Sequence, residues 1–460
     1  MTTLAATVPA VTALASFCAD LTWERIPEAA RARTAELVLD LLGVAVRGRA
    51  AASSRAVEAF VRTQPSGAAW VALAMGASAH AIEMDDVTTE SSLHPGAAVI
   101  PAALALGRER RASGRAALEA IVSGYEVTIR VGNALGAASA YRRGFHPTGV
   151  AGVFGAATAA GKILGLDAAG LADAMGIAGT MASGSLAYLD DGAWTKRLNP
   201  GWAAHGGIVA AGLAATGFTG PRTAIDGARG LLAGYTDAPD PTRLLEALSA
   251  DDLQVMHVSI KPYGCCRYCH GIIDAVLELR AAHRIAPEDV ASMRLGVLSG
   301  GWPLIADPPE RVRDPRNVVD AQFSAPYAAA VALVRGRAGL AEFGEEALRD
   351  PRVRALLPRI ECERDPSLDA EYPRRWPAAV ALRLRDGRVL HARIENALGE
   401  PENPVPRDAL VARFVEMVAR PDARLVAERV LGLADERDLG VAFFAGGSAP
   451  SHPGAGSPST

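Results

Sequence analysis

The sequence has few cysteines, few charges and no long apolar run. Five of its 460 residues are cysteine, an odd number that argues against a disulfide framework in a chain of this size. Charged residues make up 21% and the net charge is −4, so the basic excess of a general nucleic-acid-binding protein is missing. No uninterrupted apolar stretch of about 20 residues occurs, which predicts no membrane span. No Lys or Arg precedes Arg25, so a secretory signal is not indicated and we expect a cytoplasmic protein.

Hydrophobic residues, by contrast, make up half of the chain. This composition supports large buried cores, and the length allows two or three domains. Apolar residues at helical spacing predict helices at 8–21, 27–46, 113–135, 149–164 and 168–182. A high alanine content also favours helix. We therefore expect residues 1–256 to form the first part of an all-helical domain.

The pattern changes near residue 236, where a turn-rich segment begins. We expect a helix at 241–249, strands at 293–298 and 380–384, and a hairpin through Asp386 and Gly387 into a strand at 388–395. Helical segments at 271–283 and 325–334 lie between these strands, so residues 257–396 read as an α+β domain. Helices at 407–419 and 423–433 return residues 397–445 to the first domain. Residues 446–460 are rich in Gly, Ser and Pro and are predicted to be disordered.

Two histidines share the same local sequence context. His94 and His146 each precede a proline and a helix of small residues, which places both near a helix N-terminus, where backbone N–H groups favour anions. A His-Pro pair also occurs simply as a loop turn. Two copies of the arrangement favour a functional interpretation.

A third candidate lies in the segment 190–200 (DDGAWTKRLNP), which reads as a loop around Lys196, with His205 at a following helix start. The loop is either a surface salt-bridge cluster or a clamp for carboxylates. A charge-assisted hydrogen bond contributes about 1.5–3 kcal/mol. Two or three such bonds would therefore hold a polycarboxylate.

The segment 261–270 (KPYGCCRYCH) is the most unusual in the chain. It formally contains the haem-attachment pattern C-x-x-C-H, but a single such site in a large helical chain without an export signal argues against haem. Its cysteines and histidine are too crowded for the usual paired zinc geometry. No thioredoxin-like pattern surrounds them, and an iron–sulfur cluster needs at least three well-placed thiolates. We expect no metal.

Together these segments resemble the MmgE/PrpD family. The resemblance rests on 80–86 (HAIEMDD) leading to His94 and Pro95, on 144–149 (GFHPTG), on Lys196 with His205 and Gly206, on 261–270, and on 323–327 (FSAPY). The family contains 2-methylcitrate dehydratase, cis-aconitate decarboxylase and iminodisuccinate epimerase. The resemblance implies a mainly α fold, with a large all-helical domain, a smaller α+β lid domain and the active site between them. It also implies a homodimer, no metal, no organic cofactor, and a small polycarboxylate as substrate.

The resemblance also assigns site residues, which are Asp86, His94, His146, Lys196, Lys261 and Tyr327. Cys266 stands where cis-aconitate decarboxylase has a catalytic histidine. Glu83 stands where that enzyme has Asp, and Val87 where it has Thr. These departures speak against decarboxylase activity and leave the broader class intact.

The family's shared chemistry is proton movement at a carbon next to a carboxylate, which needs a base, an acid and stabilisation of negative charge. We expect lysines to bind substrate carboxylates, with Arg267 and Glu83 as further substrate-binding residues, and His94 and His146 to act as acid and base. Tyr327 would donate a proton or a hydrogen bond, and Asp86 would orient a histidine or bind a hydroxyl. Cys266 is either an acid/base group, if Lys261 and Arg267 favour its thiolate, or a small buried residue lining the site.

Three functions fit these roles. The first is a cofactor-independent lyase, a hydro-lyase similar to 2-methylcitrate dehydratase. The second is an epimerase, isomerase or decarboxylase built on the same scaffold. The third is a non-catalytic binding member of the family, against which the presence of both lysines and both loop histidines argues.

Overall fold

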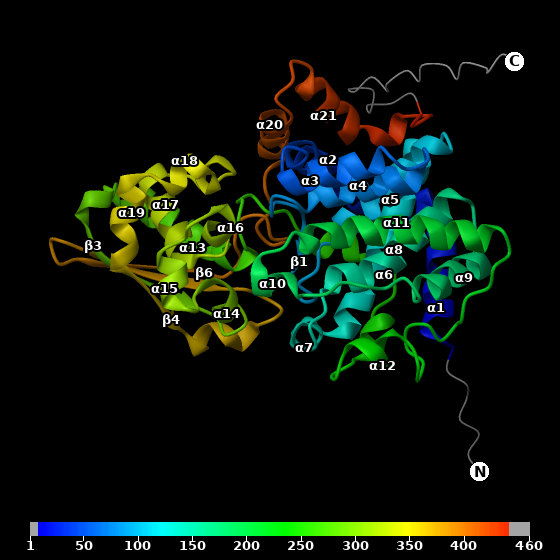
Figure 1. Ribbon diagram of the computed structural model, residues 1–460, viewed down its shortest axis with the longest axis horizontal. Helices are drawn as coiled ribbons and strands as arrows, with labels where there is room; N and C mark the ends of the chain where they lie inside the picture. Colours follow the sequence, from blue (N-terminus) through cyan, green and yellow to red (C-terminus); the bar gives the residue numbers. More distant parts are fainter. Residues whose placement is uncertain (1–7, 441–460) are drawn as a thin grey trace, which may run out of the picture.

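The computed structural model describes residues 8–440, which form two bodies joined at one side (Figure 1). The expected tail at 446–460 lies outside the described residues. The larger body is helical and its core runs from Ala10 to Ile260 and again from Val405 to Leu439. The smaller body has a separate core between Tyr263 and Leu384. The mainly α fold with a smaller α+β part is therefore confirmed.

Over the described residues, the helical domain contains twelve α-helices before the chain crosses over, followed by two that return. They are α1 (Ala10–Asp20), α2 (Glu28–Gly48), α3 (Ala52–Val61), α4 (Ala68–Ala79), α5 (Gly96–Glu109), α6 (Gly114–Leu135), α7 (Ala137–Arg142), α8 (Pro147–Ile163), α9 (Ala168–Ala178), α10 (Tyr188–Asp191), α11 (Thr195–Ala215), α12 (Leu231–Tyr235), α20 (Arg407–Val418) and α21 (Ala423–Leu431). The expected helices at 8–21, 27–46, 113–135, 149–164 and 168–182 are confirmed as α1, α2, α6, α8 and α9. No helix within residues 8–440 combines the length and the apolar character needed to cross a membrane.

Small residues allow the central helices to pack closely. A Cβ atom on Gly155 of α8 would lie 1.8 Å from the Thr128 hydroxyl and 2.3 Å from the Gly124 carbonyl oxygen of α6. A Cβ atom on Gly201 of α11 would lie 2.3 Å from the Leu73 carbonyl oxygen of α4. These glycines therefore set how near α8 and α11 approach their neighbours, and both helices carry site residues at their N-terminal ends.

The smaller domain is built on a four-stranded sheet in the order β4-β3-β5-β6, with β3 and β4 parallel and the other pairs antiparallel. Its strands are β3 (Val290–Val297), β4 (Ile360–Arg364), β5 (Ala378–Leu384) and β6 (Val389–Ile394). The expected hairpin at Asp386 and Gly387 joins β5 to β6, and Gly387 has a φ of 93°, a conformation that glycine adopts without strain. Its helices are α13 (His270–His283), α14 (Trp302–Ile305), α15 (Pro309–Arg313), α16 (Val318–Gln322), α17 (Ala325–Arg335), α18 (Glu345–Leu348) and α19 (Pro351–Leu356).

The chain departs from the predicted elements at three places. The helix expected at 241–249 is wrong, since only one 3₁₀ turn forms at Pro241–Leu244. There Ala247 has a φ of 47°, which interrupts a right-handed helix, and Arg130 donates to the carbonyl oxygens of Glu246 and Ala247 at 2.6 and 3.4 Å. Strand β4 was not predicted. The loop expected around Lys196 is the first turn of α11, and His205 lies in the middle of that helix.

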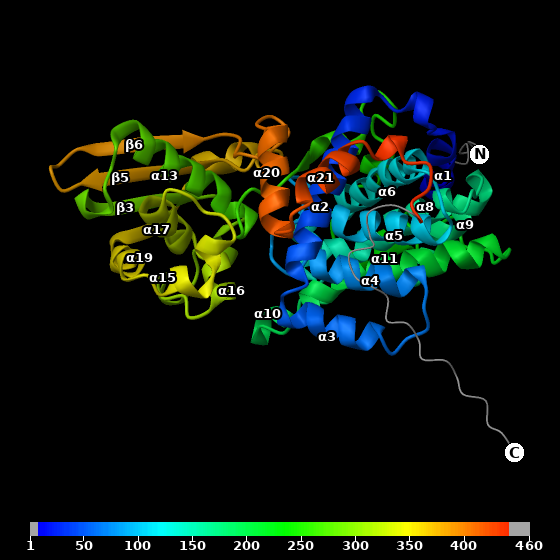
Figure 2. The ribbon, with the colours of Figure 1, turned by 90° about the horizontal axis from the view of Figure 1, so that it is seen from above.

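The two domains meet beside α10, α20 and a short ladder of β1 (Val87–Thr88) with β2 (Val258–Ser259) (Figures 1 and 2). This antiparallel ladder pairs Val87 with Ser259 and Thr88 with Val258. It ties the loop between α4 and α5 to the segment that leads into the second domain. Lys261, two residues after β2, is thereby brought to that loop.

Candidate active site

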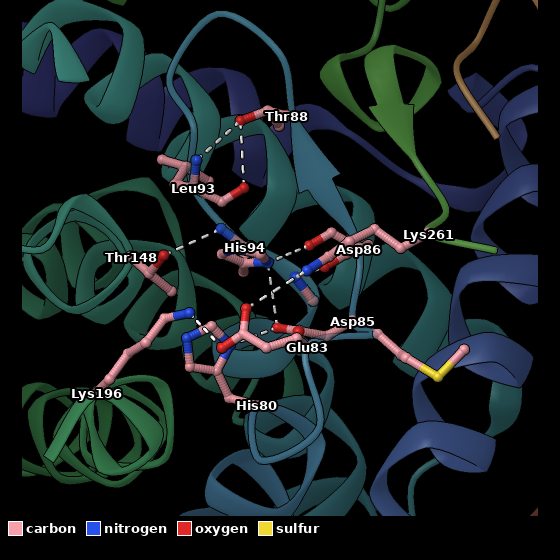
Figure 3. Close-up of polar contacts among 12 residues, drawn as sticks. His80, Glu83, Asp85, Asp86, Thr88, Leu93, His94, Thr148, Lys196 and Lys261 are labelled. Atoms are coloured by element: carbon pink, nitrogen blue, oxygen red, sulfur yellow. Dashed lines mark hydrogen bonds and ion pairs between the residues drawn. The ribbon is translucent and has the colours of Figure 1, made fainter. Parts of the chain in front are cut away.

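Charged and imidazole side chains gather around the loop between α4 and α5, at the junction of the two domains (Figure 3). Glu83 lies in the first part of this loop and has a φ of 58°, a conformation that costs a non-glycine residue energy and needs support from its surroundings. Hydrogen bonds on either side supply that support. Gln322 donates to the Ile82 carbonyl at 3.4 Å, and Arg413 donates to the Met84 carbonyl at 3.1 Å.

Glu83 forms ion pairs with two lysines that reach it from different elements. Lys196 of α11 contacts Oε1 directly, and the Lys261 ammonium lies 3.9 Å from Oε2. Burial opposes ionisation of Glu83, but Lys196 and then Lys261 outweigh it and hold the pKa of this carboxyl far below its ordinary value. The Lys196 ammonium also lies 5.3 Å from the ring of Phe323 in the α+β domain. Both domains therefore contribute to the site.

Behind Glu83, Asp85 lies between two imidazole rings. Its Oδ2 atom accepts a hydrogen bond from His80 Nδ1 at 2.6 Å and lies 3.3 Å from His94 Nδ1. Burial opposes ionisation of Asp85, yet His80 and His94 hold its pKa well below the ordinary value. The Nε2 atom of His80 is buried and has no hydrogen-bond partner among residues 8–440.

The partners of His94 define its tautomer. His94 Nδ1 lies 2.6 Å from the Asp86 carbonyl oxygen, which can only accept, so the proton belongs on Nδ1. Burial, opposed by Asp85, lowers the pKa of His94 to about 4. The ring is therefore neutral near pH 7, and its Nε2 atom carries a free lone pair. The backbone N–H of His94 also donates to the Thr148 hydroxyl at 3.1 Å, which ties it to α8.

His146 has the opposite tautomer. It is the N-cap residue of α8, and its Nδ1 atom lies 3.1 Å from the amide nitrogen of Asn199 on α11. Because that amide donates, His146 Nδ1 accepts and the neutral ring carries its proton on Nε2. Burial, and then the neighbouring His80 and Lys196, lower the pKa of His146 well below its ordinary value. His94 thus offers a lone pair and His146 an N–H, with ring centroids 4.8 and 5.6 Å from that of His80.

Two family models match the chain in sequence, the MmgE/PrpD N-terminal domain over residues 12–244 and the MmgE/PrpD C-terminal domain over residues 263–431. Together they cover well over half of its length. The chain belongs to the MmgE/PrpD family. Lys261 falls between the two matched segments, whereas His94, His146 and Lys196 fall within the first.

Curated relatives in the MmgE/PrpD family carry one activity in their names. The chain is 28% identical over 434 residues to cis-aconitate decarboxylase of Aspergillus terreus, and the aligned region covers 86% of this chain and 87% of that protein. It is 28% identical to human cis-aconitate decarboxylase, covering 77% and 73%, and 28% identical to the cis-aconitate decarboxylase-like protein oryM of Aspergillus oryzae, covering 76% and 75%. A decarboxylase that releases CO2 from carbon is a lyase, so these relatives are lyases or are named after one.

The carboxylate of Asp86 is directed to the start of α5. It accepts from the Gly96 N–H at 3.0 and 3.2 Å and from the Tyr125 hydroxyl at 2.6 Å. Burial, and then the adjacent charge of Asp85, raise its pKa to about 7. Asp86 holds His94 through its backbone carbonyl, and the carboxylate that contacts the histidines belongs to Asp85. Sequence reasoning missed this because the two aspartates are adjacent and only backbone geometry decides which one points inward.

Three further expected site residues are held in other roles. Burial raises the pKa of Cys266 to about 12, which favours the second of its two alternatives, a small buried residue, over an acid/base thiolate. Arg267 pairs with Glu400, and its guanidinium lies 5.6 Å from the Trp376 ring. The Tyr327 hydroxyl donates to the Glu342 carbonyl at 2.9 Å inside the core of the α+β domain, so neither Arg267 nor Tyr327 is directed at Glu83 and the lysines.

His80, Asp85 and His94 also lie close enough to reach one metal ion, with ligand atoms within 4.8 Å of one another. The hydrogen bond from His80 to Asp85 and the bond from His94 to the Asp86 carbonyl already use the inward-facing nitrogen of each ring. Lys261 is near enough to lower the pKa of His94, and its positive charge disfavours a cation. The arrangement fits a hydrogen-bonded acid/base cluster better than a metal site.

A cavity of about 320 Å³ lies beside this cluster, between α6 and the segment around Arg374. Thr88 of β1 and Glu90 of the loop that follows contribute to its wall, together with Arg243 and Glu246. Arg243 already pairs with both Glu90 and Glu246. None of the site histidines or lysines lines this cavity, so we place the chemistry at the Glu83 cluster.

Proposed function

We propose that the protein is a cofactor-independent lyase that acts on a small polycarboxylate by acid/base chemistry at a carbon next to a carboxylate. One observation carries the proposal, which is the opposed tautomers of His94 and His146 beside two lysines. A base needs a lone pair and an acid needs a proton. The hydrogen-bond partners of the two rings fix one tautomer with a lone pair on Nε2 and one with a proton on Nε2. The names of the curated relatives support the same class.

In the proposed reaction a substrate carboxylate binds the ammonium group of Lys261. His94 Nε2 removes the proton from the adjacent carbon, and the negative charge that develops on the carboxylate is stabilised by the lysine. In a hydro-lyase the C–H electron pair forms the new double bond as the C–O bond breaks. His146 Nε2–H protonates the departing oxygen, and water leaves. A positioned acid or base of this kind contributes typically about 10²- to 10⁴-fold.

Decarboxylation is the second candidate, because the curated relatives are named for it. In that reaction the bond to the departing carboxylate breaks, its electron pair remains on carbon, and the Nε2–H of His146 supplies the proton to that carbon. The base is then not needed. The two reactions are therefore distinguished by the substitution His94→Gln, which should stop dehydration and spare decarboxylation.

Proton NMR in D₂O tests this function on the chelator-treated protein with methylcitrate, citrate, cis-aconitate and iminodisuccinate. We expect new vinyl signals from a hydroxylated substrate, or loss of carbon dioxide from cis-aconitate, at a rate that removal of metal does not change. His205→Gln is a matched control, because His205 stacks on Trp202 at 5.2 Å and takes no part in the cluster. A panel without turnover and without exchange of any α-proton would show that the proposed function is wrong and would favour a non-catalytic member.

We also propose that the protein is a homodimer, as the family resemblance implies. Phe60, Val71 and Trp202, from α3, α4 and α11, are between 43% and 51% exposed and offer an apolar face to a second copy. Light scattering after size-exclusion chromatography should give about twice the chain mass of 47.7 kDa. A mass of one chain across a range of concentrations would contradict the proposal.

A further inference from the structure

The active-site loop is fastened at Met84, the residue between the two carboxylates of the cluster. Arg413 of α20 donates a hydrogen bond to the Met84 carbonyl oxygen at 3.1 Å. The Met84 side chain is 2% exposed and packs into a small apolar cluster with Val44 of α2 and Met417 of α20. Met84 is therefore held through both its main chain and its side chain.

Arg413 is itself oriented by an ion pair. Its Nη1 atom lies 2.8 Å from Oδ1 of Asp40 in α2, and the two side chains are 13% and 3% exposed. The Nη2 atom is the donor to Met84, so two nitrogens of one planar guanidinium address one partner each. The rigid fork of arginine suits such a two-point contact, whereas the ammonium of a lysine is a single point charge.

Spacing along α2 and α20 explains why these groups meet. Asp40 and Val44 lie four residues apart on α2, and Arg413 and Met417 lie four residues apart on α20. Residues at this spacing share one face of a helix. Each helix therefore presents a charged and an apolar residue together, and the pair of helices holds the carbonyl of Met84 at one point and its side chain at another.

The position of Met84 governs both carboxylates of the cluster. Glu83 precedes it in a left-handed conformation, with a φ of 58°, which the surroundings must hold. Asp85 follows it and lies 2.6 Å from His80 Nδ1 and 3.3 Å from His94 Nδ1. A displacement of about 1 Å at a catalytic group can cost about 100-fold in rate. The hold on Met84 is thus a hold on the chemistry.

We propose that Arg413, oriented by Asp40, is a positioning residue for the reaction and fixes Glu83 and Asp85 by holding the peptide between them. The inference rests on the proposed function, because it takes the cluster of histidines and lysines as the place of the chemistry. Arg413 acts through the loop and not on the substrate. It adds to the site a helix that lies 329 residues further along the sequence than Met84.

NMR of protein labelled with ¹⁵N-histidine tests the inference beside kcat/KM. In wild type the Nδ1–H groups of His80 and His94 are hydrogen-bonded and should give downfield signals that exchange slowly with water. The double variant Asp40→Asn/Arg413→Met removes both charges together, so no buried ion loses its partner, while Met84 loses its donor. We expect both signals to shift and to exchange faster, and kcat/KM to fall by about tenfold or more.

Arg413→Lys is the second variant, because it keeps a positive charge beside Asp40 but lacks the planar fork, and it should change both readouts in the same direction. Arg420→Met is the matched control, since Arg420 follows α20 directly and pairs with Asp422 at 2.7 Å. It should keep the wild-type histidine signals and kcat/KM.

Folded variants in which the histidine signals or kcat/KM stay at the wild-type values would overturn the inference. A lower thermal midpoint with unchanged histidine signals would also overturn it, because that result describes a structural role alone. Changed signals in the variants of a protein that turns over no substrate would sustain the hold of Arg413 on the cluster and count against the lyase chemistry alone.

Discussion

Replacement of Asp85 by Asn changes the charge of the cluster without changing its shape. Asp85 lies 2.6 Å from His80 Nδ1 and 3.3 Å from His94 Nδ1, and its negative charge raises the pKa of His94 against the lowering effect of burial. Without that charge the pKa of His94 should fall below about 4, which makes its Nε2 atom a weaker base. Loss of one charge-assisted hydrogen bond costs about 1.5–3 kcal/mol. In the transition state this energy corresponds to a fall in kcat/KM of about 10- to 150-fold.

The assay is kcat/KM as a function of pH for wild type and Asp85→Asn, on whichever substrate the NMR panel identifies. The acidic limb, where His94 becomes protonated, should move to lower pH in the variant while the plateau falls. A structural role alone would lower the plateau and leave the limb in place. Unchanged kcat/KM together with an unchanged limb would refute the proposal that Asp85 supports His94 as a base.

Four further predictions follow from single contacts. Lys261→Met should raise KM by about tenfold or more, because it loses a charge-assisted bond to the substrate. Lys162→Met is the control, since it loses only bonds to the Cys18 and Leu21 carbonyls and should keep the wild-type KM; equal effects of the two substitutions would contradict the assignment of Lys261. In Asn199→Asp the new carboxylate should accept a hydrogen bond from His146 Nδ1, which moves the proton of the neutral ring away from Nε2. We therefore expect kcat to fall while KM changes little, and an unaltered kcat would argue against His146 as the acid. Tyr327→Phe should leave kcat/KM intact and lower the free energy of unfolding by about 1 kcal/mol, because only the bond to the Glu342 carbonyl is lost; a large loss of activity would restore Tyr327 to the site. The pKa of Asp86 is raised to about 7 in the folded protein, so its contribution to stability is complete below the unfolded pKa of about 4 and declines as pH rises to about 7. Denaturant titrations should therefore show that wild type loses stability relative to Asp86→Asn between these two pH values. A constant difference in the free energy of unfolding would contradict the pKa shift.

Helical spacing and turn chemistry predicted the long, periodic elements well. α1, α2, α6, α8, α9, α13 and α17, together with the hairpin of β5 and β6, lie close to where the pattern placed them. Two of the failures have a local cause. A proline at 200, in the second turn of α11, made the start of that helix resemble a loop, and the left-handed backbone at Ala247 interrupts the helix expected at 241–249.

The sequence indicates only part of the candidate site, because some of its residues are brought there by the packing of distant segments. His94, His146, Lys196, Lys261 and Glu83 follow from motifs, because each lies within a recognisable run of residues. His80 lies in the same quoted run, but only its bond to Asp85 shows that it belongs to the cluster. Asn199 lies on α11 with Lys196, and Phe323 lies in the second domain, and only the packing of α11 and of that domain brings them to the site. Tyr327 lies four residues beyond Phe323 in the same motif, and the turn of α17 directs it into the core.

The opposed tautomers of His94 and His146 are the central claim, and exchange of the substrate α-proton with D₂O tests it most directly. Proton NMR should follow this exchange in wild type, His94→Gln and His146→Gln under identical conditions. We predict that His146→Gln retains exchange but forms no product, since the base remains and the acid is lost, and that His94→Gln shows neither exchange nor dehydration. Exchange that persists in His94→Gln at the wild-type rate would contradict the assignment of the base and, with it, the proposed mechanism.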